Sequence, residues 1–212
     1  SGVAGQDWQE VKIGNIGNTF NGLSGKTKED FGIGSLYISY KNIFKYKFIT
    51  NQVCDLVNVQ KNERQNVVQY GDILFTVSSE TPNEVGVSSV YLGNNPVYLN
   101  SFCFGIRLEN FKTLSPDFAG HYFRGQDFRR MMYKLAQGST RFNLTKSEVL
   151  KLNIKLPPLE EQTRISSILS AADTEIIQLE EKLTNYKEQK KGLLQQLLTG
   201  KKRVNLKNKE AA

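Results

Sequence analysis

The chain has 212 residues and a formal net charge of +7, so it can hold one ordinary globular domain and an appendage, whereas two full domains would be cramped. Hydrophobic residues make up 39% and aromatic residues 10% of the chain, which excludes a disordered protein. The basic charge favours an anionic partner, most commonly nucleic acid, although charge alone suits a merely basic soluble protein equally well.

The chain is expected to work in the cytoplasm. No stretch approaches the roughly 20 apolar residues that a membrane span needs, and the amino terminus lacks the apolar core of a signal peptide. Cys54 and Cys103 have no partner histidine nearby, which indicates buried thiols and neither a zinc site nor a disulfide framework. Residues 1–5 are interpreted as a leader or tag remnant outside the fold.

Short β-prone runs fill the chain from Trp8 to about Leu114, separated by Gly, Asn, Asp and Pro. Apolar and polar residues alternate in these runs, as they do in strands that bury one face. The pattern therefore predicts a twisted, mostly antiparallel sheet, with strands expected at residues 36–40, 72–77, 86–92 and 101–107.

A helix is expected to begin after Ser115. Ser is a preferred helix cap, Pro116 suits the first helical position, and Asp117 complements the positive end of the helix. The helix should run to about Ala136 and end at Gly138, because Gly can adopt the left-handed turn that closes a helix.

A second β-like segment at residues 149–156 leads into Pro157 and Pro158. Proline disfavours helix in the residue before it and suits the first turn of a following helix. We therefore place a domain boundary here and assign residues 6–156 to one α+β domain.

A long coiled-coil helix is predicted in residues 157–203, followed by a flexible tail at 204–212. Its apolar positions alternate in steps of four and three, and Lys190 occupies one of them. A helix this long needs burial of its apolar face, so a partner helix is expected, the alternative being packing along its own domain. The predicted dimerisation residues are Ile165, Leu169, Ala172, Ile176, Leu179, Leu183, Tyr186, Leu193 and Leu197.

Motifs for catalysis are incomplete. Residues 25–27 (Gly-Lys-Thr) resemble the end of a phosphate-binding loop, but Phe20 stands where that loop needs glycine. Residues 95–98 (Asn-Pro-Val-Tyr) are similar to the adenine-gripping tetrapeptide of amino-methyltransferases, but Val97 breaks the motif. His121 lacks the context of a catalytic nucleophile. We therefore assign no catalytic residue and no metal ligand, and we predict a binding domain with a helical spacer.

Several blocks together resemble the DNA specificity subunits of type I restriction-modification systems. The blocks are residues 71–75 (Gly-Asp-Ile-Leu-Phe), 136–140 (Ala-Gln-Gly-Ser-Thr) with Leu144, 156–162 (Leu-Pro-Pro-Leu-Glu-Glu-Gln) with Ile165, Ile168, Leu169, Asp173 and Ile176, and 193–200 (Leu-Leu-Gln-Gln-Leu-Leu-Thr-Gly). The resemblance covers about residues 8–203, and its carboxyl-terminal blocks are the most specific.

The resemblance implies a non-catalytic subunit that recognises double-stranded DNA. In that family each recognition domain binds one half of a bipartite target, and paired long helices dock the methyltransferase subunits. A restriction and translocase subunit completes the complex, and S-adenosylmethionine, ATP and Mg belong to partner subunits. Typical members have two recognition domains and two helices. This chain has one of each, so it is interpreted as a natural half-subunit, a truncation product or a fragment, and a half-subunit is expected to form an antiparallel homodimer.

Candidate DNA contacts fall in loops and divide into two groups. Cationic side chains are expected to contact phosphates: Lys26, Lys28, Lys41, Lys45, Lys47, Lys61 and Arg64. Side chains able to address base edges are Ser78, Ser79, Glu80, Thr81, Ser139, Thr140, Arg141 and Asn143. Two other classes stay open: a DNA-binding regulator or decoy with the same fold and no methyltransferase partner, and a small nuclease or methyltransferase acting alone.

Overall fold

A computed structural model describes residues 8–138 and 140–203, and the chain divides into two units, residues 1–166 and 167–212. The first unit is an α+β domain that also contains the first turns of the long helix. The second contains the rest of that helix. None of the helices in the described ranges is both long and apolar enough to span a membrane.

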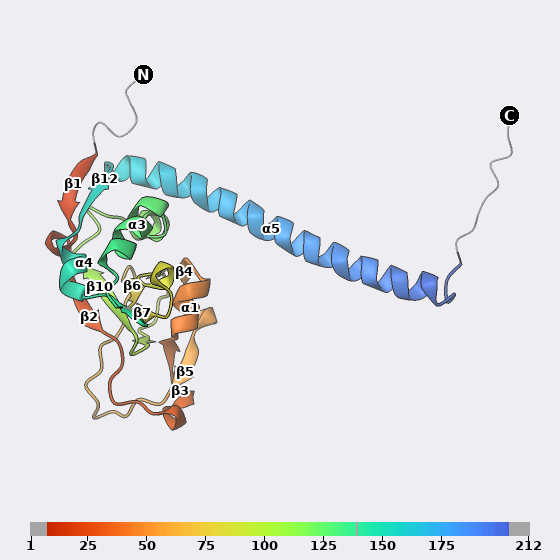
Figure 1. The fold of residues 1–212 in the computed structure, drawn as a ribbon, viewed down its shortest axis with the longest axis horizontal. Helices are drawn as coiled ribbons and strands as arrows, with labels where there is room; N and C mark the ends of the chain where they lie inside the picture. The colour runs from red at the N-terminus through yellow and green to blue at the C-terminus, as the bar shows by residue number, and fades with distance from the viewer. Residues whose placement is uncertain (1–7, 139, 204–212) are drawn as a thin grey trace, which may run out of the picture. The chain divides into compact units, whose positions relative to one another are not determined.

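The strands of the domain form four small sheets (Figure 1). The largest has the order β2 (Gly17–Asn21), β10 (Cys103–Leu108), β6 (Ile73–Thr76), β8 (Ser88–Tyr91) and β4 (Phe48–Ile49). The others are β5 (Asp55–Val57), β3 (Phe31–Ile38) and β9 (Tyr98–Leu99); β1 (Gln9–Lys12) with β12 (Asn153–Leu156); and β7 (Ser78–Ser79) with β11 (Phe142–Asn143). Among the described strand pairs only β3–β9 and β4–β8 are parallel, which confirms the mostly antiparallel prediction.

The helices are α1 (Tyr40–Lys45), α2 (Pro116–Tyr122), α3 (Gln126–Leu135), α4 (Lys146–Lys151) and α5 (Leu159–Leu198). Four single turns of 3-10 helix connect strands: η1 (Ile13–Asn15), η2 (Lys28–Asp30), η3 (Asn51–Val53) and η4 (Pro82–Glu84).

Both faces of the five-stranded sheet are buried. On one face, Phe75 of β6 and Phe104 of β10 stack with ring centroids 5.3 Å apart, and Phe123 and Phe128 pack against Phe75 from the α2–α3 segment at 5.6 and 6.1 Å. Leu74 points to the opposite face, in the cluster that includes residues of α1 and β3. Because successive side chains of a strand alternate between faces, burial on both sides explains the continuous apolar run of β6.

The predicted helix from Ser115 to Ala136 is wrong in one respect, because the structure has two helices there. The predicted cap is confirmed: the Ser115 hydroxyl accepts a hydrogen bond from the Phe118 N–H, and Pro116 is the first helical residue. The break comes at Gly125, whose extended backbone caps α3. The turn between the two helices lets both Phe123 and Phe128 reach the core, since their rings contact each other at 4.6 Å.

The predicted β-like segment at residues 149–156 is also partly wrong. Its first half belongs to α4, and only Asn153–Leu156 form a strand, β12, which pairs antiparallel with β1. Val149 lies in α4, and its side chain is fully buried in the core. A short apolar run of this kind is found both in buried helices and in buried strands, so the sequence alone does not distinguish the two.

The Gly-Asp pair that precedes β6 has a structural role. Gly71 has φ +84°, and a Cβ atom there would lie 2.4 Å from the Phe111 ring, so only glycine fits. Asp72 is 2% exposed and accepts hydrogen bonds from Arg107 Nε at 3.0 Å and Nη2 at 2.7 Å. Burial raises the pKa of Asp72, and the bonds from Arg107 offset part of that rise.

The predicted long helix is confirmed as α5, which runs for 40 residues from Leu159. Gln162 in its first turn is fully buried and joins it to the domain: Nε2 donates to the carbonyls of Thr113 and Pro157 at 2.8 and 2.9 Å, and Oε1 accepts from the Ser115 N–H at 2.9 Å. Ile165 packs against the domain core.

Beyond these turns, large apolar side chains of the predicted heptad positions are between 41% and 57% exposed. They are Leu169, Ile176, Leu179, Leu183, Tyr186, Leu193 and Leu197.

Candidate nucleic-acid interface

The two segments predicted to address base edges lie side by side. Strand β7 pairs with β11, with Asn143 opposite Ser78 and Phe142 opposite Ser79. We call the exposed residues of this strand pair and its flanking loops the β7–β11 surface: Glu80, Thr81, Thr140, Arg141 and Asn143. Ser139 lies outside the described residues.

Ser78 and Ser79 do not contribute exposed side chains to this surface. They are 5% and 8% exposed, and the Ser79 hydroxyl donates to Glu84 Oε2 at 2.7 Å. Both serines therefore hold the strand in place, and among the predicted residues of this segment the accessible side chains are those of Glu80 and Thr81.

Aromatic side chains border the β7–β11 surface. The Arg141 guanidinium lies over the Phe102 ring at 5.5 Å from its centroid, and Phe102 is 55% exposed. The Tyr40 hydroxyl donates to the Ser78 carbonyl at 3.0 Å, which brings the start of α1 against β7. A cation over an aromatic face is held in a defined position, so Arg141 is oriented without being buried.

A pocket of about 700 Å³ opens beside Tyr40. It is lined by Phe31, Gly32, Tyr37, Ser39, Tyr40, Lys41, Cys54, Asp55, Leu56 and Asn100. Burial raises the pKa of both Tyr37 and Tyr40, so each hydroxyl keeps its proton at neutral pH and can donate as well as accept hydrogen bonds. Lys41 is the one cation in this lining and is exposed, as its predicted phosphate-contacting role requires.

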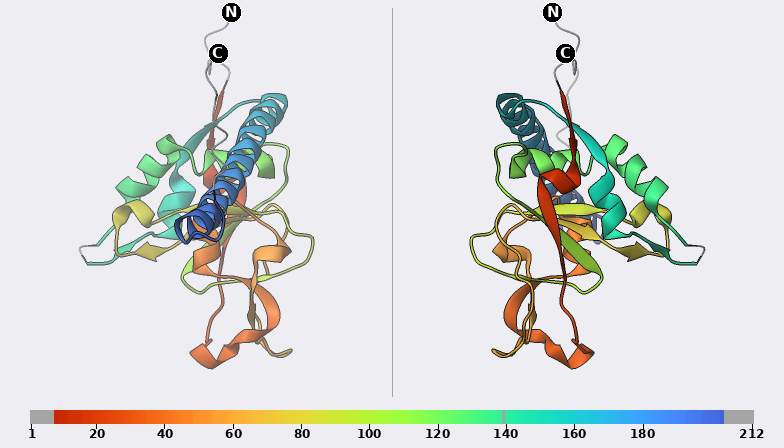
Figure 2. Two further views of the ribbon diagram at one scale, coloured as in Figure 1. Left: turned by 90° about the vertical axis from the view of Figure 1, so that its right-hand side faces the viewer. Right: turned by 90° about the vertical axis from the view of Figure 1, so that its left-hand side faces the viewer.

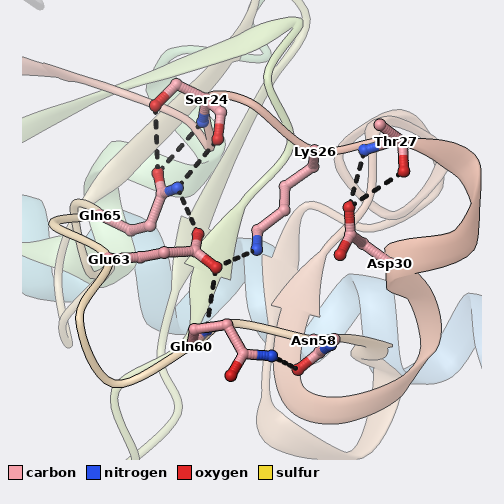
Figure 3. Close-up of polar contacts among 8 residues, drawn as sticks. All are labelled: Ser24, Lys26, Thr27, Asp30, Asn58, Gln60, Glu63 and Gln65. Atoms are coloured by element: carbon pink, nitrogen blue, oxygen red, sulfur yellow. Dashed lines mark hydrogen bonds and ion pairs between the residues drawn. The ribbon is translucent and has the colours of Figure 1, made fainter.

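A second set of predicted phosphate contacts lies on two loops that are tied together (Figure 3). Lys26 Nζ pairs with Glu63 Oε1 at 2.6 Å, and the side-chain amide of Gln65 bonds to the Ser24 carbonyl at 2.9 Å. The Lys26 side chain is only 5% exposed, so its ammonium group binds Glu63 on the neighbouring loop and is not presented to solvent. The predicted cations Lys28, Lys61 and Arg64 are exposed on the same two loops.

The hydrogen bond from Lys26 is the largest cause of a lowered pKa at Glu63, which falls to about 2, and bonds from the Gln60 N–H and the Gln65 side chain add to it. The carboxylate therefore stays ionised across the physiological range and holds the two loops through three donors.

The remaining predicted cations lie around α1. Lys45 is exposed, with its ammonium 5.0 Å from the centroid of the Tyr46 ring. Lys47 is half-buried, with Nζ 3.1 Å from His121 Nδ1. His121 itself is 8% exposed and packs edge-on against Phe48 at 5.3 Å. His121 therefore packs within the domain, against a side chain of β4.

A basic group on α3 and on the turn before it is absent from the predicted contacts. Arg124, Arg129, Arg130 and Lys134 line a pocket of about 660 Å³ together with Asn83, Gln126 and Tyr133. The signal was present in the sequence as four cations within eleven residues around a single acid, Asp127. The predicted contacts lie in loops, whereas these cations lie in the segment predicted to be one helix.

No group of three or more His, Cys, Asp or Glu side chains in the described ranges is arranged to hold a metal ion. The candidate interface is therefore made of hydrogen-bonding, cationic and aromatic side chains, which are the types that contact nucleic acid.

The sequence profile of the family described as "Type I restriction modification DNA specificity domain" matches residues 5–188. The chain belongs to this family. The family membership confirms the resemblance that the sequence blocks indicated, and it extends over both the α+β domain and most of α5.

Curated relatives and solved structures agree with this assignment. The putative type I restriction enzyme MjaX specificity subunit of Methanocaldococcus jannaschii is 26% identical over 92% of this chain and 46% of its own length. The StySPI specificity subunit of Salmonella potsdam is 23% identical over 83% of this chain and 39% of its own length. The chain thus spans about half the length of these specificity subunits or less.

Among solved structures, the HsdS subunit of Thermoanaerobacter tengcongensis shares the fold with a TM-score of 0.57 at 20% identity, covering 90% of this chain and 44% of that one. A structure of a type I restriction-modification system described for its complex assembly gives a TM-score of 0.60 at 21% identity, covering 89% of this chain and 44% of its own. The specificity fold is therefore shared by the domain of this chain and by larger subunits.

Proposed function

We propose that this chain recognises one half of a bipartite DNA target within a type I restriction-modification complex. The observation that carries the proposal is the β7–β11 pairing, which sets two segments with base-reading side chains next to each other in a domain of the specificity family. Arg141, Asn143 and Glu80 are exposed there and suit guanine, adenine and cytosine edges respectively.

The predicted phosphate contacts lie in two other parts of the domain. Lys41 lies beside the aromatic pocket, and Lys28, Lys61 and Arg64 project from the two joined loops. Phosphate contacts position the protein on the duplex without specifying its sequence, and each neutralised phosphate adds roughly 0.9 to the salt slope of binding. Lys26 is left out of this set because Glu63 occupies its ammonium group.

Catalysis belongs to other subunits in this proposal. The chain supplies sequence recognition, while methylation and cleavage, with their S-adenosylmethionine, ATP and Mg, take place on the methyltransferase and restriction subunits. A role as a DNA-binding regulator or decoy differs in one observable respect, since such a protein would not co-purify with a methyltransferase.

The long helix provides the connection to these partners and to a second recognition domain. Its exposed apolar positions suit a coiled coil, and their regular spacing is self-complementary, so we place a second copy of the chain antiparallel along α5. Two identical domains related by a twofold axis would recognise a palindromic, interrupted target.

The recognition role is tested by replacing Arg141. The chain is co-expressed with type I methyltransferase subunits from the same organism, and the methylated sites are mapped to define the target. Arg141→Ala should then relax the choice at one base pair, at a cost of about 1–3 kcal/mol for the preferred base.

Arg64→Ala is the matched control, because a phosphate contact should weaken binding to all sequences alike. If Arg141→Ala gives the same uniform weakening, Arg141 does not address a base. If the wild-type complex methylates without any sequence preference, the recognition role itself is wrong.

A further inference from the structure

The pocket on α3 concentrates positive charge that the described chain does not neutralise. Arg124 and Arg129 are half-buried, and within the described residues their guanidinium groups bond only to uncharged oxygen atoms. Arg124 donates to the carbonyls of Ser88 and Tyr46 at 2.7 and 2.8 Å. Arg129 Nη2 donates to the carbonyls of Asn83 and Val85 at 2.6 and 2.9 Å.

The buried atom Arg129 Nη1 has no hydrogen-bond partner in the described chain. A buried donor without an acceptor is costly, and a buried cation without a counter-ion more so. Burial lowers the pKa of both arginines, and the charge of Arg129 lowers that of Arg124 further. An anion in the pocket would supply the missing counter-charge.

Two further cations stand at the rim. Arg130 and Lys134 line the same pocket and are exposed, and Tyr133 between them is 50% exposed. Asp127 is 93% exposed and approaches Arg130 no closer than 3.4 Å, a surface contact that holds the arginine weakly. Glu84, between the two residues that Arg129 binds, accepts a hydrogen bond from the Ser79 hydroxyl. The rim cations are therefore free to meet an incoming anion.

The pocket adjoins the β7–β11 surface. Arg129 binds the backbone of η4, and η4 directly follows Thr81 at the end of the predicted base-reading segment. In the left view of Figure 2, α3 in green and η4 in yellow lie on the same side of the domain. An anion in the pocket would thus lie next to the bases contacted by that segment.

We propose that the α3 pocket binds a backbone phosphate of the target DNA, with Arg130 and Lys134 as its contacts and Arg129 adding positive charge behind them. This inference rests on the proposed DNA-recognition function. Backbone phosphates flank every base that the β7–β11 surface could contact, and a guanidinium presents the paired donors that suit a phosphate. Fixing one phosphate at η4 would set the register of Thr81 and Glu80 on the duplex.

The test removes the rim charges and leaves the buried arginines intact. The full chain, in complex with its methyltransferase subunits, is titrated onto a duplex of about 30 base pairs of random sequence over a range of salt concentrations. Arg130→Gln combined with Lys134→Gln should make the salt slope shallower by about 0.9, the contribution of one phosphate. Asp127→Asn should tighten binding, because it removes the acid beside Arg130.

The matched control is Lys12→Gln combined with Lys155→Gln. It removes the same charge from exposed residues of β1 and β12 and should leave the slope at the wild-type value. Equal slopes for the two double variants would overturn the inference. Loss of assembly with the methyltransferase subunits in Arg130→Gln combined with Lys134→Gln, but not in the control, would also overturn it, since the pocket would then bind carboxylates of a methyltransferase subunit. Absence of duplex binding by the wild-type complex would instead overturn the proposed function itself.

Discussion

At the scale of single residues, several charged groups that look available for DNA are committed to the fold. Lys26 is the clearest case, because its sequence context is a glycine-containing loop with a second lysine, yet its ammonium is paired with Glu63 across 37 residues. Asp72 is also committed to the fold, because its carboxylate is buried against Arg107. Spacing along the chain cannot reveal such partners, since each pair joins segments that are distant in sequence.

The Lys26–Glu63 pair predicts a titration. The pKa of Glu63 lies at about 2, below its ordinary value of 4.5, so its stabilising contribution is complete above about pH 4.5 and is lost as the pH falls towards 2. The side-chain carboxyl resonance of Glu63, followed by NMR, should titrate with a midpoint near 2. Lys26→Met should move that midpoint towards 4.5, because it removes the donor with the largest effect. Lys28→Met, an exposed neighbour, should leave it in place, and an unchanged midpoint in Lys26→Met would refute the assignment.

At the scale of elements, the side-chain amide of Gln162 attaches the first turn of α5 to the domain. Gln162 satisfies one backbone N–H and two carbonyls that would otherwise be buried without partners. Gln162→Ala should lower the free energy of unfolding by about 3 kcal/mol, the cost of leaving such groups unpaired. Urea denaturation of the full chain measures this. Gln178 is an exposed glutamine on the same helix, and Gln178→Ala should change the free energy of unfolding by less than about 0.5 kcal/mol. Equal effects of the two substitutions would show that the hydrogen bonds of Gln162 do not stabilise the fold.

How far the sequence predicts an element depends on whether its signal is local. The Ser115 cap, the Pro157–Pro158 boundary region and the heptads of α5 are local signals, and the helix start and the long helix were predicted correctly from them. The break between α2 and α3 was missed because Gly125 resembles a tolerated helix glycine, and only the packing of Phe123 with Phe128 requires the turn. The pairing of β7 with β11 joins residues more than sixty positions apart, so no periodicity could predict it.

At the scale of the whole molecule, the proposal depends on what covers α5. The exposed apolar positions recur from Leu169 to Leu197, and a segment of this length is long enough to form a stable coiled coil. In a single helix, however, the apolar face would stay in contact with water. A homodimer would cover that face and supply the second half of an interrupted target. The two recognition domains would then be held at a separation fixed by the number of residues in the helix.

That separation can be changed in steps. Seven residues inserted after Gln178 keep the heptad phase and lengthen a helix by about 10 Å, which corresponds to about three base pairs at ~3.4 Å each. In a dimer, both half-sites should remain unchanged while the spacer between them grows by about three base pairs, as mapped from methylated sites. Four inserted residues disturb the phase of the heptads, so light scattering should show a weakened dimer. If the wild-type protein has the mass of one chain in the same measurement, α5 does not hold two recognition domains together. If the spacer is unchanged by the seven-residue insertion, α5 does not set the distance between the half-sites.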